Sequence, residues 1–226
     1  MKILAATLIV AATGCSSLPG PVEYSDDGLL RVPSTAAAGV YRAEGWPFIQ
    51  YKEIVLEPLV VTFARDWEKN HPDVPPKEIR RMRDEAAKNF RDTFTKEIIG
   101  RAKYRFAQAP GEHVLLINPT VVDLDVPAPD TNADTKSYAP GPPKMQIVSE
   151  LRDSVSGKLV GRVSMFAGQD TYGFNELRLA NRVTNAHDMG VAFTRYIRVL
   201  REALDVAKVE RPRPQKAPPQ RGETTR

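Results

Sequence analysis

The stretch KMQIVSELRDSVSGKLVGRVSMFAG, residues 144–168, contains two alternating segments on either side of a polar turn. In the second segment, Leu159, Val163 and Met165 share one face. Alternation with a period of two is typical of strands that bury one face. The turn Asp153–Gly157 joins the segments, so we predict a β-hairpin. The predicted inward positions of the first segment are Met145, Ile147, Ser149 and Leu151.

Two segments outside the hairpin have the apolar spacing of amphipathic helices. The first runs from Pro76 to Ile99, and we expect Gly100 to form a left-handed cap after it. The second begins near Thr184 or Asn185, either of which is a suitable N-cap. The first stripe consists of Ile79, Met82, Ala86, Phe90, Phe94 and Ile98, and the second of Met189, Phe193, Tyr196, Ile197, Leu200 and Leu204.

Three further segments are predicted strands. Residues 52–63 are rich in branched apolar residues, with Pro58 marking a bulge or an edge position. Residues 104–107 form a short strand, and residues 113–126 form a long one. In the long strand, the side chains expected on one face are Val114, Leu116, Val122 and Leu124. We leave residues 171–183 without an assignment because their pattern fits neither period.

The order strand, helix, short strand, long strand, hairpin, helix indicates the α+β class. Two amphipathic helices must bury their stripes, and one face of a mixed, mainly antiparallel sheet accommodates both. We therefore predict a two-layer sandwich. We divide the chain into a cleaved lipoprotein signal peptide (1–14), a flexible tether (15–40), a single α+β domain (41–208) and a disordered basic, proline-rich tail (209–226).

The positive charge of the chain is concentrated outside the predicted domain. The formal net charge is +4, and Lys2 together with the tail carries this excess. The basic residues of the tail are Arg211, Arg213, Lys216, Arg221 and Arg226, against Glu210 and Glu223. A nucleic-acid-binding protein concentrates positive charge on its folded surface, so we expect no nucleic-acid partner. The tail could contact anionic lipid or cell-wall polymer, and the alternative is plain disorder without a binding role.

The N-terminus has the organisation of a bacterial lipoprotein precursor. Lys2 precedes an uncharged run over residues 3–12, which is too short to span a bilayer. The following Ala-Thr-Gly-Cys resembles the lipobox and contains Cys15, the single cysteine of the chain. The resemblance implies cleavage between Gly14 and Cys15, diacylglycerol on the Cys15 sulfur and an N-acyl chain, including palmitate. The alternative is an ordinary secretory signal whose cleavage site lies near a cysteine.

The residue after the lipobox cysteine indicates the membrane in which the protein is anchored. Ser16 stands where inner-membrane lipoproteins of Gram-negative bacteria carry Asp. By this resemblance, the protein is anchored in the outer membrane with its domain in the periplasm. Two or three acyl chains give stable anchoring, since each buried CH₂ contributes about 0.8 kcal/mol. We expect no cofactor beyond this covalent lipid.

Candidate catalytic and metal-binding residues do not form a convincing set. Asp123 and Asp125 share a strand face, as a polar strand face would, although a hydrolase pair is the alternative. Asp130, Asn132 and Asp134 match part of a calcium loop, but the required Gly and bidentate Glu are missing. His113 and His187 lack a nucleophile nearby in the sequence. We therefore expect no enzymatic activity and no metal site.

Two segments are candidates for binding. Residues 127–143 form a loop that is long for a connector, and it contains Tyr138. Tyr172 and Phe174 place aromatic side chains in the unassigned segment. The alternative is that both segments cover an edge of the sheet. We name Tyr138, Tyr172 and Phe174 as a candidate binding surface.

Three stretches of the chain resemble a family of Gram-negative lipoproteins catalogued as domain of unknown function 3313. They are YKEIVLEPLVVTF, IIGRAKYRFAQAPGEHVLLINPTVVDLDV and IVSELRDSVSGKLVGRV, within residues 41–208. The resemblance implies an envelope location and a small α+β domain, and it supplies no reaction or catalytic residues. We expect a non-catalytic binding or assembly module with an envelope protein partner. The alternatives are an accessory subunit of a lipid-transport system and a hydrolase of envelope polymers.

Overall fold

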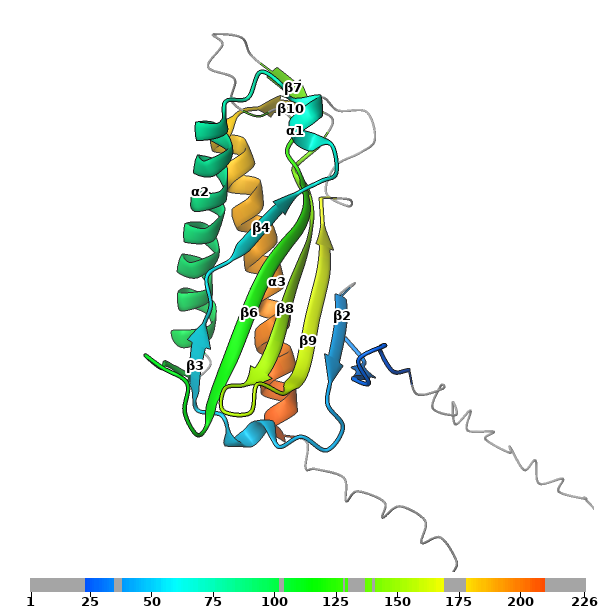
Figure 1. Ribbon diagram of the computed structural model, residues 1–226, viewed down its shortest axis with the longest axis vertical. Coiled ribbons are helices and arrows are strands. Elements are labelled where there is room, and N and C mark those ends of the chain that lie inside the picture. Colours follow the sequence, from blue (N-terminus) through cyan, green and yellow to red (C-terminus); the bar gives the residue numbers. More distant parts are fainter. Residues whose placement is uncertain are drawn as a thin grey trace, which may run out of the picture.

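The computed structural model describes residues 23–34, 38–101, 104–127, 129, 137–139, 141–168 and 178–209 (Figure 1). The strands are β1 (Leu30–Val32), β2 (Ala38–Arg42), β3 (Glu53–Leu56), β4 (Val60–Phe63), β5 (Arg105–Phe106), β6 (Val114–Asp125), β7 (Ser137–Ala139), β8 (Lys144–Asp153), β9 (Leu159–Ala167) and β10 (Arg178–Ala180). The helical segments are η1 (Phe48–Gln50), α1 (Trp67–Asn70), α2 (Pro76–Phe94), η2 (Thr95–Ile99) and α3 (Arg182–Val209). Within the ranges given above, no helix is both long enough and apolar enough to cross a membrane.

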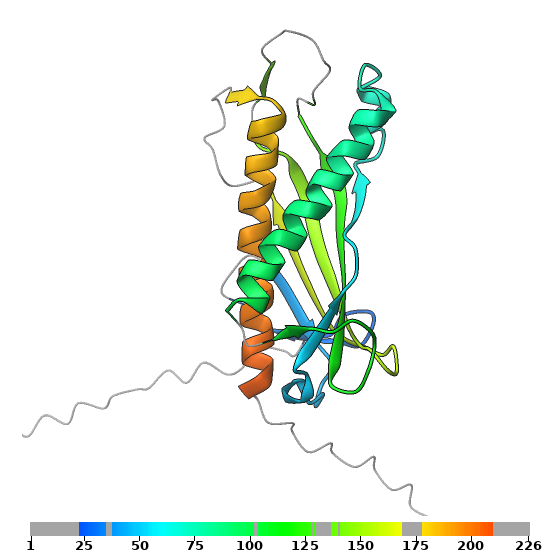
Figure 2. The same ribbon diagram turned by 90° about the vertical axis from the view of Figure 1, so that its left-hand side faces the viewer.

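Eight of the described strands form one mixed sheet in the order β1-β2-β9-β8-β6-β3-β5, with β4 also paired to β6. Along this order, the neighbouring strands β1, β2, β9, β8 and β6 pair antiparallel. Strands β3 and β4 run parallel to β6. Strands β7 and β10 form a separate antiparallel ribbon. Figures 1 and 2 show α2 and α3 on the same face of the large sheet. The predicted α+β class and two-layer arrangement are therefore confirmed.

The two helices bury the predicted apolar stripes against the sheet and against each other. Every residue of both stripes is buried. Phe90 of α2 meets the Phe193 ring of α3 edge-on, with 5.4 Å between ring centroids. The Tyr196 hydroxyl donates a hydrogen bond to the Val163 carbonyl oxygen of β9 (3.1 Å), which satisfies this polar group inside the core. Burial raises the pKa of the Tyr196 phenol well above its usual range.

The hairpin forms as predicted, but a bulge at Val160 buries that residue and leaves the predicted inward Leu159 only partly buried, opposite Arg152. Strands β8 and β9 pair antiparallel, with Ile147 opposite Met165 and Ser149 opposite Val163. The inward side chains of β8 are buried, and the residues between them are partly exposed. The turn is held by Asp153, whose side chain accepts hydrogen bonds from the backbone N–H and hydroxyl of Ser156 (2.8 and 2.7 Å).

Strand β6 buries the predicted Val114 and Leu124, but between them it buries the opposite face from the one predicted. Leu115, Ile117 and Val121 are fully buried, whereas the predicted Leu116 and Val122 are only partly buried. Asp123 then adopts a left-handed φ of 54°, and the pairing with both β4 and β8 shifts at this point. This bulge inserts one extra residue, which returns the inward direction to Leu124. The side chains that point inward therefore have opposite parity before and after the bulge, so one uninterrupted alternation could not predict both parts of β6.

The predicted strand over residues 52–63 is interrupted at Pro58. Strands β3 and β4 flank residues 57–59, and both pair with β6. Proline has no N–H for the ladder, which explains why the strand breaks there. The Glu57 N–H still donates to the Ile117 carbonyl oxygen (3.0 Å), so β3 keeps its register up to the break.

Ordered structure begins earlier than the predicted boundary at residue 41. Residues 30–32 and 38–40, which were assigned to the tether, belong to β1 and β2. Strand β2 pairs with β9, placing Val40 opposite Val163. The short apolar segments here lack a long periodic pattern, so their pairing depends on a strand that lies far away in the sequence. The predicted tether is therefore too long at its C-terminal end.

Both predicted helix caps differ from the observed ones. Helix α3 begins at Arg182, and the Asn181 side chain accepts hydrogen bonds from the N–H groups of Val183 and Thr184 (2.9 and 3.0 Å). Asn181 is thus the N-cap rather than Thr184 or Asn185. Gly100 has φ −71° and ψ −24°, which is right-handed. The chain leaves α2 through the wider turn η2, so the left-handed cap predicted at Gly100 is wrong.

Candidate functional site

The face of the sheet opposite α2 and α3 carries no helix among the described residues (Figure 2). Its side chains come from the outward positions of β4, β6, β8 and β9, which are exposed or partly exposed. We call the following set the open face: Val60, Thr62, Thr120, Val122, Gln146, Val148, Ser164 and Phe166. Strand register aligns these side chains in rows, one of which runs through Val60, Thr120, Val148 and Ser164. They therefore form one continuous surface of uncharged side chains, which is bordered next to Gln146 by the exposed Lys144 of β8 and by Asp125 opposite it.

Phe166 is the large apolar side chain that stands out on the open face. It is 66% exposed, although its neighbour Met165 on the other face of β9 is buried. Gln146 lies directly opposite it on β8, and Val60 on β4 is 56% exposed. Exposed aromatic side chains are typical anchors of protein–protein interfaces. The open face therefore has the composition of a binding surface.

Charged residues border the open face on the side of the N-terminal segment. Arg162 of β9 forms ion pairs with Asp27 and with Glu150 of β8. Arg152 pairs with the same Glu150 at 2.8 Å. This network connects the segment before β1 to the strands of the hairpin. It separates the uncharged open face from the end of the molecule where the N-terminal segment lies.

The end of the molecule at the bottom of Figure 1 contains η1, the β8–β9 turn and the last turn of α3, and we call it the lower end. A hydrogen-bonded chain links two of these parts. Trp46 Nε1 donates to the Tyr51 hydroxyl (2.8 Å), which donates to Asp153 Oδ2 (3.0 Å). Burial raises the pKa of Tyr51 to about 12. Burial opposes the charge of Asp153, but hydrogen bonds from Ser156 and Tyr51 outweigh it and lower the Asp153 pKa.

Three aliphatic side chains are exposed at the lower end. Ile49 of η1 is 66% exposed, and Val155 of the β8–β9 turn is 68% exposed. Val206 near the end of α3 is 52% exposed. The Lys158 ammonium lies over the Trp46 ring, 4.7 Å from its centroid. This end therefore combines apolar tips with a half-buried tryptophan and a cation.

An apolar cavity of about 120 Å³ lies between the sheet and the C-terminal half of α3. Strands β1 and β2, with Phe48, form one wall, and Val199, Ala203 and Ala207 contribute to the other. Ligand-binding pockets usually measure about 300–1,000 Å³. The cavity is therefore suited to a few methylene groups rather than to a whole phospholipid.

A wider polar groove of about 730 Å³ runs between α2 and α3 on their outer side. The helices approach closely at its floor, where a Cβ added to Gly190 would lie 3.1 Å from Asn89. Asn89 Nδ2 donates to the Ala186 carbonyl oxygen (3.3 Å). The groove is open and shallow, and its polar floor is already hydrogen-bonded within the protein, so we assign it a packing role.

Glu97 of η2, which directly follows α2, connects this segment to α3. Its carboxylate is 2% exposed and accepts a hydrogen bond from Arg201 of α3 (2.9 Å). Arg198 and Arg101 lie within 3.6 and 3.7 Å of the same carboxylate. A buried carboxylate requires such partners, so this cluster has a sufficient structural explanation.

Tyr138 is the predicted binding residue that the structure describes. It is 58% exposed on β7, at the upper end of the molecule, opposite Leu179 of β10, which is 41% exposed. The pair forms a small exposed apolar patch. Gly14, Cys15, Tyr172 and Phe174 lie outside the described residues.

The predicted acidic pair is not brought together with other catalytic groups. Asp123 occupies the bulge, and Asp125 lies opposite Lys144 of β8. Neither residue lines any of the three cavities found near the helices. Asp130, Asn132 and Asp134 lie outside the described residues. In the part of the chain that the structure describes, no three His, Cys, Asp or Glu side chains are grouped to hold a metal ion.

Sequence reasoning did not single out Phe166, Ile49 or Val155. A signal existed for Phe166, because the hairpin alternation assigns it to the outward face of β9 while it remains aromatic. Val155 is likewise an apolar residue inside a polar turn. In both cases, an apolar residue occupies a position where the sequence pattern predicts a polar one, and this could have identified the exposed residues from the sequence.

The chain was compared with protein families, curated proteins and solved structures. The family model described as "Protein of unknown function (DUF3313)" matches residues 24–189. No curated protein matches the chain. Three solved structures are similar in fold: the PelC dodecamer from Paraburkholderia phytofirmans (13% identity, 70% of this chain and 96% of that chain, TM-score 0.33), a PDZ domain protein from Parabacteroides distasonis (9%, 78% and 36%, TM-score 0.39), and a neuraminyllactose-binding hemagglutinin homolog from Helicobacter pylori (8%, 74% and 86%, TM-score 0.30). These likenesses are weak, and nothing below depends on them.

Proposed function

This chain belongs to the family described as protein of unknown function DUF3313, and we propose that it is a lipid-anchored lipoprotein of the outer membrane. In this proposal, Cys15 carries the lipid and the domain faces the periplasm. The domain acts there as a non-catalytic binding or assembly module for an envelope protein. The lipobox-like sequence supports the anchor, and the open face supports the binding role.

The observation that carries the binding role is the exposure of Phe166 within an uncharged sheet face. An outward, solvent-exposed position of a strand does not require an apolar side chain for folding, yet this position of β9 carries an aromatic ring. Ser164, two residues before Phe166 on β9, is small, and Gln146 lies directly opposite on β8, which leaves the ring accessible to a flat partner surface. Truncation of such aromatic anchors typically costs about 2 kcal/mol or more of binding free energy.

Site-specific crosslinking in cells tests this role. A photoreactive phenylalanine analogue at Phe166 is expected to capture an envelope protein, which mass spectrometry of the adduct identifies. The same analogue at Lys88 on the outer face of α2, where the side chain is 78% exposed, is the matched control and should capture none. We expect Phe166→Asp to abolish the complex while changing the free energy of unfolding by only about 0.5 kcal/mol. Equal capture from both positions would contradict the proposal.

The lipid-transport alternative is favoured by one observation, the apolar cavity between α3 and the sheet. At about 120 Å³ it would hold only part of an acyl chain. Phospholipid that copurifies in stoichiometric amount would favour this alternative over the binding module.

The hydrolase alternative depends on Asp123 and Asp125. We expect the double variant Asp123→Asn/Asp125→Asn to retain the partner captured from Phe166, because both residues lie outside the open face. Turnover of peptidoglycan or other envelope polymer that is present in the wild type and lost in this variant would instead identify a hydrolase.

A further inference from the structure

We propose that the lower end of the domain contacts the phospholipid bilayer directly, with Ile49, Val155 and Val206 as its apolar contacts. The proposal rests on the anchored lipoprotein described above, because the anchor brings the domain to the membrane. It adds which end of the domain touches the bilayer.

The apolar contacts come from three different segments that are fixed to one another. Ile49 lies in η1, between Trp46 and Tyr51, and Val155 lies two residues after Asp153. The Trp46–Tyr51–Asp153 hydrogen bonds therefore connect the segment that bears Ile49 to the turn that bears Val155. Exposed aliphatic tips on rigid turns lose little conformational entropy when they are buried in an interface.

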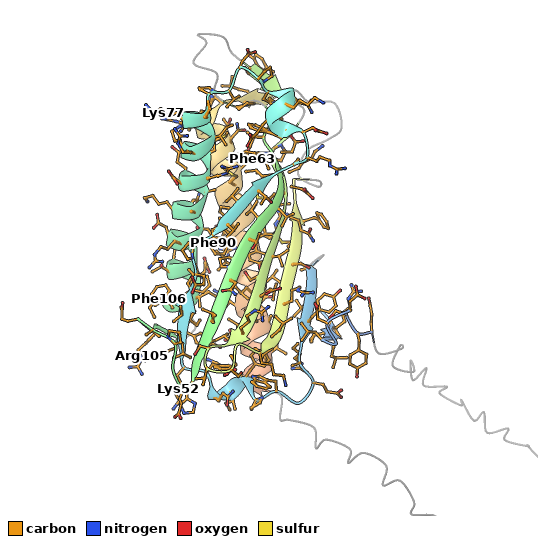
Figure 3. The ribbon with its side chains drawn as sticks, viewed as in Figure 1. Lys52, Phe63, Lys77, Phe90, Arg105 and Phe106 are labelled. Carbon is orange, nitrogen blue, oxygen red and sulfur yellow. The ribbon has the colours of Figure 1, made fainter. Side chains whose placement is uncertain are left out.

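The polar residues of the lower end fit the headgroup region. Lys52, Lys158 and Arg105 are exposed there, and Figure 3 shows Lys52 and Arg105 at the bottom of the molecule. Arg105 lies 3.8 Å from Glu53, so the local charge is mixed rather than strongly positive. Trp46 beside Lys158 adds the aromatic–cation pairing that is common at membrane interfaces. These residues favour a bilayer surface over a purely acidic partner.

The path of the chain places this end next to the anchor. The Tyr24 hydroxyl donates to Glu44 (3.1 Å), two residues before Trp46, so the N-terminal segment begins beside the lower end. Seven residues lie between Cys15 and Glu23, and a span of this length extends at most about 30 Å. At the other terminus, α3 ends at the lower end, and the basic residues of the tail follow it. Both chain ends therefore direct the same end of the domain toward the lipid.

Quenching of tryptophan fluorescence tests the contact, because the chain contains only two tryptophans. Trp46 lies at the lower end, whereas Trp67 is 3% exposed and belongs to α1 at the opposite end. The chain from Cys15 onward is coupled through its single thiol to vesicles of phosphatidylethanolamine and phosphatidylglycerol that contain maleimide lipid and brominated acyl chains. We expect the bromine to quench the emission of the wild type and not that of Trp46→Phe.

Charge substitutions identify the side chains that make the contact. We expect Ile49→Asp/Val155→Asp to reduce quenching to the level of Trp46→Phe. Val183→Asp is the matched control, because Val183 is 69% exposed in the first turn of α3, where Asp is tolerated. This variant should be quenched like the wild type. Far-ultraviolet circular dichroism of each variant verifies the fold.

The outcomes separate this proposal from the anchor. Coupling through maleimide does not require lipidation in cells, so absent palmitate would contradict the anchor and leave the quenching result valid. No quenching of the coupled wild type would overturn the membrane contact. Quenching that survives the Ile49 and Val155 substitutions, or that Val183→Asp also removes, would overturn the assignment of the contact to the lower end.

Discussion

Replacement of Cys15 by serine should abolish the incorporation of labelled palmitate and release the protein from the membrane fraction. Serine preserves the size of the side chain but cannot form the thioether to diacylglycerol. Three acyl chains of ordinary length contribute tens of kcal/mol through about 0.8 kcal/mol per CH₂, so their loss cannot be offset by the weaker contacts of the domain. Metabolic labelling and membrane fractionation measure both effects.

The residue that follows provides the control for this experiment. We expect Ser16→Asp to keep the palmitate label while moving the protein to the inner-membrane fraction, because the thioether chemistry at Cys15 is unchanged. Palmitate that persists in Cys15→Ser would show that the lipobox-like sequence is not used. An ordinary secretory signal would then be the better interpretation of residues 1–14.

Replacement of Phe90 by alanine should lower the free energy of unfolding by about 3–5 kcal/mol. The Phe90 ring is 1% exposed and lies between the two helices and the sheet. Its centroid is 5.4 Å from that of Phe193, 6.3 Å from that of Phe94 and 6.4 Å from that of Tyr196. Alanine would leave a cavity where all three neighbours lose contacts. Urea unfolding monitored by circular dichroism measures the loss.

The same substitution at Phe166 is the matched control. Its ring is 66% exposed, so Phe166→Ala should change the free energy of unfolding by about 0.5 kcal/mol or less. The pair of variants compares identical chemistry on the covered face and on the open face of the same domain. Losses of similar size at the two positions would mean that the open face is covered in solution, which contradicts its assignment as an accessible surface.

The parts of the fold that could be predicted are those in which one residue pattern covers a whole element. The hairpin alternates without interruption from Met145 to Leu151, and the α2 stripe continues through η2 to Ile98. Strand β6 could not be predicted correctly because the bulge at Asp123 divides it into two segments of opposite parity. Only the partners β4 and β8 determine where that extra residue is inserted.

The candidate surfaces were harder to predict because exposure depends on which face the helices cover. Phe166 and Met165 are neighbours of similar hydrophobicity, yet only Met165 faces the helices. Ile49 lies in a short turn whose orientation is set by hydrogen bonds to Asp153, more than a hundred residues away. Tyr138 was predicted because its loop is unusually long, but its partner Leu179 becomes apparent only when β7 and β10 are paired.

The pairing of β2 with β9 has a consequence for the order in which the domain assembles. Val40 of β2 lies opposite Val163 of β9, so β2 needs a partner strand that is synthesised long after it. Until β9 has been synthesised, β2 has no complete sheet to join, and its hydrogen-bonding groups remain available to other chains. The closing of this long loop also slows folding. The domain can therefore reach its final topology only after most of the chain has been synthesised.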